Sequence, residues 1–244
     1  MNRLLATFFG PFLNKYFYNI NSSQIETQVL RGRAQIHDLI FKEECFIHHQ
    51  IPFYIRRGVI NTLSLFFSSE QIKIEIDNLI LIGSEVFNST FISNNSNDLP
   101  KSILKKFLLP ILQSILSIFF NSSFYSMREL FKNLTISIQK VHVRFEKIMN
   151  ASQALGIVIN SINMFSIDHR GEKTVIQNDP PTIDKRVTFN NFGIYFDTEA
   201  TNINLSSKDF ELQMIVDISN KNHQFILNPL SLNCIFTYNT KSHA

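Results

Sequence analysis

One phrase of alternating apolar residues recurs six times along the chain and constrains its fold more than any other feature. Each copy has apolar residues at positions i and i+2, a mostly polar pair, and two more apolar residues at i+5 and i+7. The copies are Ala34, Ile36, Leu39, Phe41; Ile74, Ile76, Leu79, Leu81; Ile136, Ile138, Val141, Val143; Ile157, Ile159, Ile162, Met164; Val187, Phe189, Phe192, Ile194; and Phe225, Leu227, Leu230, Leu232. Alternation with a period of two is typical of a β-strand with one buried face, so the repeat predicts a chain made mainly of strands.

The pair in the middle of each copy, such as Gln139-Lys140, moves the alternation by one residue. An extra residue in a strand sends the following side chains to the other face unless a bulge absorbs it. A hairpin turn at the pair would leave arms of roughly three or four residues, shorter than the usual strand of about five. We therefore expect long bulged strands. Regular alternation from Ile76 to Leu79, or from Ile138 to Val141, would contradict this interpretation.

A sheet that bends at the same place in strand after strand becomes a trough with a concave apolar face. Few helices are expected to cover it: an amino-terminal amphipathic helix at residues 1–18 and a central helix near residues 101–120, within a helical region at 101–131. Strands are expected at residues 24–86 and 132–244, with a loop at 87–100. The predicted fold is one domain over residues 1–244, mainly β with a few helices (α+β), built as a strongly curved antiparallel sheet that forms an open hydrophobic groove.

The first residues have apolar side chains at the spacing of an amphipathic helix, interrupted by Pro11. This helix could insert into a membrane while Arg3 and Lys15 meet anionic headgroups. The candidate membrane-docking residues are Phe8, Phe9, Phe12 and Leu13. The helix could instead cap the end of the sheet, or serve as a mitochondrial presequence, although it lacks the Arg-rich and Ser-rich face of such segments.

Composition argues against several classes of function. A net charge of +3 is too small for the basic surface of a nucleic-acid-binding protein, so no nucleic-acid partner is expected. Cys45 and Cys234 lack the spacing of a zinc or redox site and are expected to be buried free thiols in a reducing compartment. Residues 107–120 are uncharged but fall short of the roughly twenty residues that span a bilayer.

No set of residues predicts catalysis or metal binding. His48-His49 lacks a third ligand at metal-binding spacing, so we interpret it as a surface pair. Asp168-His169 is not accompanied by the glycines of a nucleophile elbow. We expect no catalytic residues, no metal site and no cofactor.

Several stretches resemble the chorein family of bridge-like lipid transfer proteins and follow the family's order. They are Leu13-Asn14-Lys15-Tyr16, Asn21-Ser22-Ser23-Gln24, Leu30-Arg31-Gly32, Asp38-Leu39-Ile40-Phe41-Lys42, Ile51-Pro52-Phe53, Lys132-Asn133-Leu134, Val141-His142-Val143-Arg144-Phe145-Glu146, Asn191-Phe192-Gly193-Ile194-Tyr195-Phe196-Asp197-Thr198 and Phe225-Ile226-Leu227-Asn228-Pro229-Leu230. The chain departs from the family at residues 66–71, where members usually have a Trp-containing turn and a longer loop, and at Leu30, where Trp is frequent. Neither departure touches the repeat.

The resemblance implies that acyl chains lie along the concave face while headgroups stay in water. The candidate lipid-binding residues are Ile36, Phe41, Phe53, Leu65, Ile74, Ile76, Leu79, Leu81, Ile136, Ile138, Val141, Val143, Ile157, Ile159, Phe192 and Ile194. About eight strands at about 4.8 Å spacing would give a groove about 40 Å long. The same residues could instead form an ordinary closed core.

The resemblance thus predicts a non-enzymatic protein that binds phospholipid and acts in lipid transfer, with phospholipids and a membrane surface as partners. The expected location is intracellular, peripheral at a membrane or membrane contact site, with the mitochondrion as one option. The alternative is an accessory structural subunit of a larger membrane protein complex, mitochondrial or other, that has kept the chorein fold. A further alternative is a scaffold whose apolar face binds a partner's helix.

Overall fold

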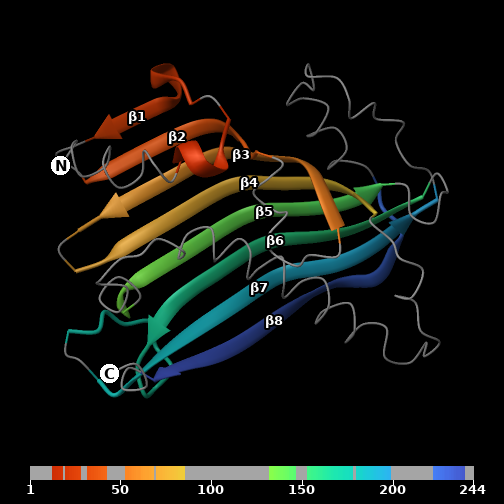
Figure 1. Cartoon of the computed structure of the whole chain (residues 1–244). Coiled ribbons are helices and arrows are strands. Elements are labelled where there is room, and N and C mark those ends of the chain that lie inside the picture. Colours follow the sequence, from red (N-terminus) through yellow and green to blue (C-terminus); the bar gives the residue numbers. More distant parts are fainter. Residues whose placement is uncertain are drawn as a thin grey trace.

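The computed structural model describes residues 13–18, 20–28, 32–42, 53–68, 70–85, 132–146, 153–177, 180–198 and 222–239. Eight strands in these ranges form one sheet whose spatial order follows the sequence, with β1 and β8 at its two edges (Figure 1). The strands are β1 (Ile25–Gln28), β2 (Arg33–Ile40), β3 (Phe53–Phe67), β4 (Ile72–Glu85), β5 (Leu134–Glu146), β6 (Ala154–Ile167), β7 (Thr182–Asp197) and β8 (Phe225–Asn239). A 3₁₀ turn, η1 (Ser22–Gln24), precedes β1. The prediction of a mainly β chain is confirmed.

The sheet is mainly antiparallel, as predicted, but one pair of neighbouring strands is parallel, which corrects a fully antiparallel arrangement. Every neighbouring pair runs antiparallel except β4 and β5, which run parallel. Parallel neighbours need a crossover connection of about a dozen residues or more, whereas antiparallel neighbours can be joined by a short turn. The chain between Glu85 and Leu134 provides such a connection. The predicted loop at residues 87–100 and the predicted helices at 101–131 lie there, outside the described residues.

The backbone confirms the predicted bulges in four of the six copies of the repeat. The non-glycine residues with a positive φ in the described chain are Asp38 (53°), Asn78 (57°), Lys140 (52°) and Asn191 (52°). Each is the second residue of a polar pair in the repeat. Ile76 and Leu79 both belong to the buried apolar cluster although they are three residues apart, and so do Ile138 and Val141. Regular alternation would place the members of each pair on opposite faces, so one residue is absorbed at each bulge.

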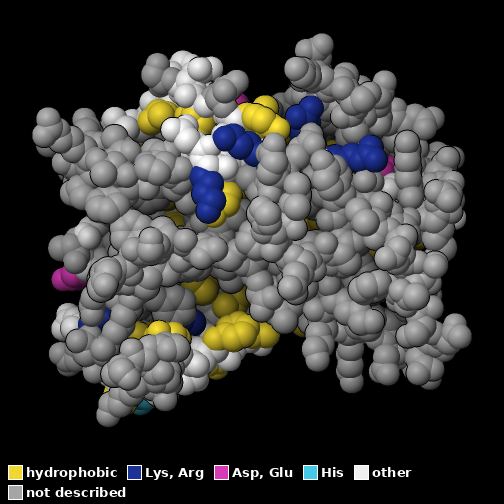
Figure 2. All heavy atoms as spheres, viewed as in Figure 1, with side chains coloured by type: hydrophobic (Ala, Val, Ile, Leu, Met, Phe, Trp, Pro, Cys, Tyr) yellow, Lys and Arg dark blue, Asp and Glu magenta, His cyan; other side chains and the backbone are white. Residues whose placement is uncertain are grey.

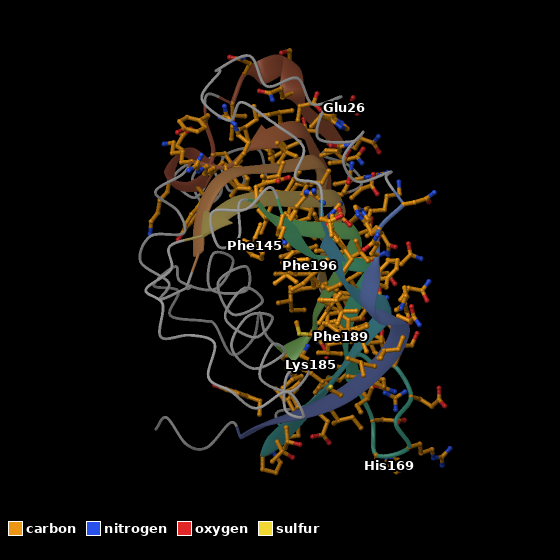
Figure 3. All side chains as sticks on the ribbon, turned by 90° about the vertical axis from the view of Figure 1, so that its right-hand side faces the viewer. Glu26, Phe145, His169, Lys185, Phe189 and Phe196 are labelled. Atoms are coloured by element: carbon orange, nitrogen blue, oxygen red, sulfur yellow. The ribbon has the colours of Figure 1, made fainter. Side chains whose placement is uncertain are left out.

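The bulges of neighbouring strands lie side by side. In the β4–β5 ladder, Asp77 pairs with Gln139 and Leu79 with Val141, so the ladder skips Asn78 and Lys140 together. The β2–β3 ladder skips Asp38 and Asn61 in the same way. Because a bulge bends its strand and increases its twist, adjacent bulges bend the sheet along one line. Figure 3 shows the sheet curved into an arc.

β3 carries a seventh copy of the repeat that the sequence analysis missed. Its apolar residues Ile60, Leu63 and Leu65 are buried in the same cluster, and Asn61-Thr62 takes the place of the polar pair. The copy is hidden because its first position is Gly58. A Cβ at Gly58 would lie 2.8 Å from side-chain atoms of both Leu81 and Phe41, so glycine is required where these two side chains pack over the strand.

The sixth copy is irregular at its first residue. Phe225 was predicted to share a face with Leu227, but it lies against Gly193 and Tyr195 on the other face, and 38% of it is exposed. The reason is a register shift between the pairs Ile194–Leu227 and Tyr195–Phe225. One extra residue on β8 at this point reverses the side on which Phe225 emerges.

The bulge conformation can be tested at Lys140, which is exposed and, among the described residues, makes only an exposed ion pair with Asp77. A left-handed backbone costs an ordinary L-residue about 1–2 kcal/mol and glycine almost nothing. Glycine at the preceding exposed position, Gln139, should instead destabilise the strand by about 0.5–1 kcal/mol. We therefore expect Lys140→Gly to show a free energy of unfolding at least about 1 kcal/mol above that of Gln139→Gly in urea titrations. Equal values for the two variants would contradict the positive φ at Lys140.

Candidate functional site

The structure gathers the candidate lipid-binding residues on one face of the sheet, here called the apolar face. All of them except Phe53 belong to one buried apolar cluster. At Phe53 the structure describes the backbone only. The cluster also includes residues that were not predicted as lipid contacts: Leu13, Tyr16, Phe17, Ala34, Leu39, Ile60, Leu63, Leu134, Phe145, Ile162, Met164 and Phe189.

The strand register arranges this face in rows that cross the sheet. One row, here called the central row, passes through directly paired residues of seven strands: Ile36, Leu63, Ile76, Ile138, Ile162, Phe189 and Leu232. A second row on the other side of the bulges contains Leu39, Ile60, Leu79, Val141 and Ile159. The apolar surface is therefore continuous across strands as well as along them.

The apolar face is buried. Ile76 is 1% exposed, Ile138 is 3% exposed and Phe192 is 0% exposed. Such a surface offers no directional interaction, only burial worth about 25 cal/mol per Å² of apolar area. Its chemistry therefore suits an apolar ligand or an apolar core.

A buried lysine ends the apolar face. Lys185 of β7 is 1% exposed, and its Nζ donates to the carbonyl oxygens of Lys132 (3.2 Å) and Leu134 (2.9 Å) and to Oγ of Ser166 (2.8 Å). Burial lowers the pKa of Lys185 to about 8. Figure 3 shows Lys185 and Phe189 on the inner side of the arc. Sequence reasoning missed Lys185. Its position two residues before Val187 could have shown that it lies on the same face as the apolar residues of the repeat.

The opposite face of the sheet holds a buried polar network centred on Arg144. Its guanidinium donates to Oε1 of Glu146 (2.6 Å), Oδ2 of Asp197 (2.6 Å) and Oη of Tyr195 (3.2 Å). Tyr195 Oη lies 2.6 Å from Nε2 of His142. Two of the stretches that carry the family resemblance, one in β5 and one in β7, thus meet at this network.

His223 joins the start of β8 to the same network. Its Nδ1 lies 3.0 Å from Oδ2 of Asp197, and its ring stacks on Tyr195 with a centroid distance of 3.7 Å. Although burial acts to raise it, the pKa of Asp197 is held below its usual value by the hydrogen bonds from Arg144 and His223. The partly buried carboxylate of Asp197 stays ionised in this arrangement and fixes the guanidinium.

Gly156 gives Tyr195 the space it needs. It pairs with Arg144 on one side and Tyr195 on the other, and a Cβ at this position would lie 1.9 Å from the Tyr195 ring. Sequence reasoning found neither this glycine nor the network. The hydrogen bonds among these groups hold β5, β7 and the start of β8 together across β6, although Nη2 of Arg144 and Nε2 of His223 have no hydrogen-bond partner in the described part of the chain.

The amino-terminal segment packs onto the sheet. Leu13 is 6% exposed, the Phe17 ring lies 4.5 Å from that of Phe41, and the backbone N–H of Lys42 donates to the carbonyl of Tyr16. For Leu13 this arrangement favours the capping alternative over membrane insertion. The other membrane-docking candidates, Phe8, Phe9 and Phe12, lie outside the described residues.

The remaining candidates are in varied places. Cys234 is exposed, which corrects the expectation of a buried thiol, since it lies on an edge strand. Asp168 caps a turn by accepting the backbone N–H groups of Arg170 and Glu172. Cys45, His48 and His49 fall outside the described ranges. Within those ranges there is neither a cluster of three metal-ligating side chains nor a helix long and apolar enough to cross a membrane.

Acid should weaken the fold through His142. Burial, with a smaller contribution from His223, lowers the pKa of His142 from 6.5 to about 3. Below pH 6.5 the unfolded chain takes up a proton that the folded chain excludes, so this contribution to stability is complete above pH 6.5 and is lost as the pH falls toward 3. We expect the free energy of unfolding to fall as the pH is lowered, and to fall faster in the parent chain than in His142→Gln. The difference between the two slopes should be up to about 1.4 kcal/mol per pH unit.

Urea titrations at a series of pH values between 7.5 and about 5 measure this slope. His169→Gln, a change in an exposed turn, is the matched control and should keep the parent slope. Parallel pH profiles for the parent chain and His142→Gln would show that His142 does not titrate as a buried neutral group.

Comparisons with known proteins find sequence similarity to intermembrane lipid transfer proteins. No protein-family model matches the chain. The human intermembrane lipid transfer protein VPS13D is 24% identical over 254 residues, which cover 97% of this chain and 6% of that protein. Intermembrane lipid transfer protein vps13B of Dictyostelium discoideum is 23% identical over 94% of this chain and 4% of its own length. Intermembrane lipid transfer protein VPS13 of Chaetomium thermophilum is 24% identical over 93% of this chain and 8% of its own.

The chain therefore spans less than a tenth of the length of these relatives. The similarity extends over nearly the whole chain, including both stretches that build the Arg144 network. These matches confirm the resemblance of the chain to the chorein family of bridge-like lipid transfer proteins.

Proposed function

We propose that the apolar face binds phospholipid acyl chains and that the protein acts in lipid transfer at a membrane. The observation that carries this proposal is the continuity of the face: bulges in neighbouring strands keep the apolar residues of both strand halves on one side. The names of the relatives, which describe intermembrane lipid transfer, support the same activity. The proposal requires no catalysis and no cofactor.

The central row is longer than an acyl chain and can hold one along its length. From Ile36 in β2 to Phe189 in β7 it crosses five strand spacings of about 4.8 Å, or about 24 Å. The hydrocarbon core of a bilayer is about 30 Å thick and contains two leaflets, so one acyl chain needs about 15 Å. Burial contributes about 0.8 kcal/mol per methylene and has no preferred direction, so the face should accept many headgroups.

Burial of the face sets a condition on this proposal. Because Ile76 and Ile138 are almost inaccessible to water, an acyl chain has to replace contacts that these side chains now make. The exchange of one apolar contact for another is nearly neutral in hydration terms, because the apolar area exposed to water changes little. Lipid binding therefore requires the residues that cover the face to move aside, but it does not require the face to be exposed to water.

The same burial supports one alternative role. A face that remains closed would fit an accessory structural subunit of a larger membrane protein complex. The membrane surface as a partner, docking through Phe8, Phe9 and Phe12, and a mitochondrial location belong to these proposals and rest on the sequence alone.

Photochemical labelling separates the two roles on folded protein. A phospholipid with a diazirine in its acyl chain is incubated with the purified chain, irradiated, and mapped by peptide mass spectrometry. We expect adducts at apolar-face residues such as Ile138 and Ile162. Ser137 and Gln139, which flank Ile138 and point the other way, serve as internal controls.

Label on the control positions at the same level as on Ile138 would show that lipid contacts the wrong face. An absence of label from the apolar face, in protein that keeps its cooperative unfolding transition, would favour the structural role.

A further inference from the structure

The positions of β7 that point to the apolar face are apolar except for one. Side chains on one face of a strand alternate with a period of two, and the bulge at Asn191 keeps the apolar residues of both halves of β7 on this face. The positions that point to it are Ile183, Lys185, Val187, Phe189, Phe192, Ile194 and Phe196. Lys185 is the polar residue among them.

Lys185 separates Ile183 from the rest of the apolar face. Ile183 is 1% exposed, yet it does not belong to the buried apolar cluster that includes Phe189 and Phe192. On the other side of Lys185, Val187 packs against this cluster. The apolar contacts along β7 are therefore interrupted at Lys185.

Hydrogen bonds hold Lys185 in place. An ammonium group has three protons, and Nζ of Lys185 lies within 3.2 Å of three acceptors, which are the carbonyl oxygens of Lys132 and Leu134 and Oγ of Ser166. Ser166 is 3% exposed and donates in turn to the carbonyl oxygen of Lys132 (2.7 Å). Because the pKa of Lys185 is about 8, most of these side chains are charged at pH 7. Moving the ammonium group aside would leave buried polar groups without their hydrogen bonds, which is costly.

The hydrogen-bonded Lys185 is an unfavourable neighbour for an acyl chain. Methylene groups gain free energy where they leave water for an apolar environment. Val187 offers that environment, and Met164 and Ile136 in the same row are apolar as well. At Lys185 the chain would have to lie on a charged group or break its hydrogen bonds.

The views of the molecule agree with this arrangement. Figure 3 shows Lys185 close to Phe189 on the inner side of the arc. Figure 2 shows hydrophobic side chains gathered in the lower part of the view, where β7 and β8 run in Figure 1. Lys185 thus lies beside a surface that is otherwise apolar.

We propose that Lys185 sets the boundary of the lipid-binding surface on β6 and β7, so that acyl chains lie against Val187 and Phe189 and do not reach Ile183. This boundary rests on the proposed lipid binding and adds to it a residue that determines how far along the strands a chain extends. An apolar residue in place of Lys185 should extend the surface to Ile183.

The test labels the chain at pH 7 with a phosphatidylcholine that carries a diazirine in one acyl chain, and maps the adducts by tandem mass spectrometry. Trypsin cleaves after Lys185 and after Arg186, so Ile183 and Val187 fall in different peptides. In the parent chain we expect at least about tenfold less label on Ile183 than on Val187, because burying a polar group without its hydrogen bonds costs at least that factor. This comparison requires no substitution.

Lys185→Met removes the charge and keeps a side chain of similar length. In protein that still unfolds cooperatively in urea, the label on Ile183 should rise to the level found on Val187. Lys140→Met is the matched control, because it makes the same substitution at an exposed position. It should keep the labelling pattern of the parent chain.

Equal label on Ile183 and Val187 in the parent chain would overturn the boundary at Lys185 and leave the proposed lipid binding intact. A folded Lys185→Met chain in which Ile183 stays unlabelled would overturn the boundary as well. An absence of label from the whole apolar face would instead contradict the proposed function, and the boundary with it.

Discussion

The rest of the structure depends on one backbone constraint, the left-handed residue in the middle of β2, β4, β5 and β7. Without it, the second half of each of these four strands would turn its apolar side chains to the other face. The left-handed conformation costs about 1–2 kcal/mol for a residue such as Lys140. The two apolar side chains that each bulge keeps inside contribute about 1.5–3 kcal/mol each, so burial outweighs the local strain. Because the bulges of adjacent strands lie together, the same constraint curves the sheet.

The contacts of the apolar face have no preferred direction, and two clusters of polar residues supply the directional contacts that it lacks. The Arg144 network and the Lys185 site lie on opposite faces; the first joins β5 to β7 across β6, and the second joins β7 to β5 and β6. Apolar side chains tolerate a slipped register if the pattern is kept, whereas a buried guanidinium or ammonium loses its partners at once. Polar groups therefore fix the register of the strands, while the apolar face itself stays chemically uniform, which is the property that a lipid-binding surface needs.

The features that depend on spacing within one strand could be predicted from the sequence, whereas contacts between residues far apart in the chain could not. The face of Ile76, Leu79 and Ile138 follows from spacing within one strand, so the repeat alone located it. The Arg144 network joins residues more than fifty positions apart, and no local pattern marks Tyr195 as its partner. The parallel β4–β5 pair depends on how the connecting chain returns, which the repeat does not encode. Gly58 hid the seventh copy, because a glycine chosen for close packing breaks an apolar pattern.

Native mass spectrometry of the gently purified chain tests the central claim most directly, since it asks whether the apolar face holds lipid in the folded protein. The account predicts that the 28.3 kDa chain, as monomer or oligomer, retains phospholipid adducts of mixed headgroup that dissociate when the protein is unfolded. Folded protein that carries no phospholipid after purification, and takes none up from vesicles, would contradict it.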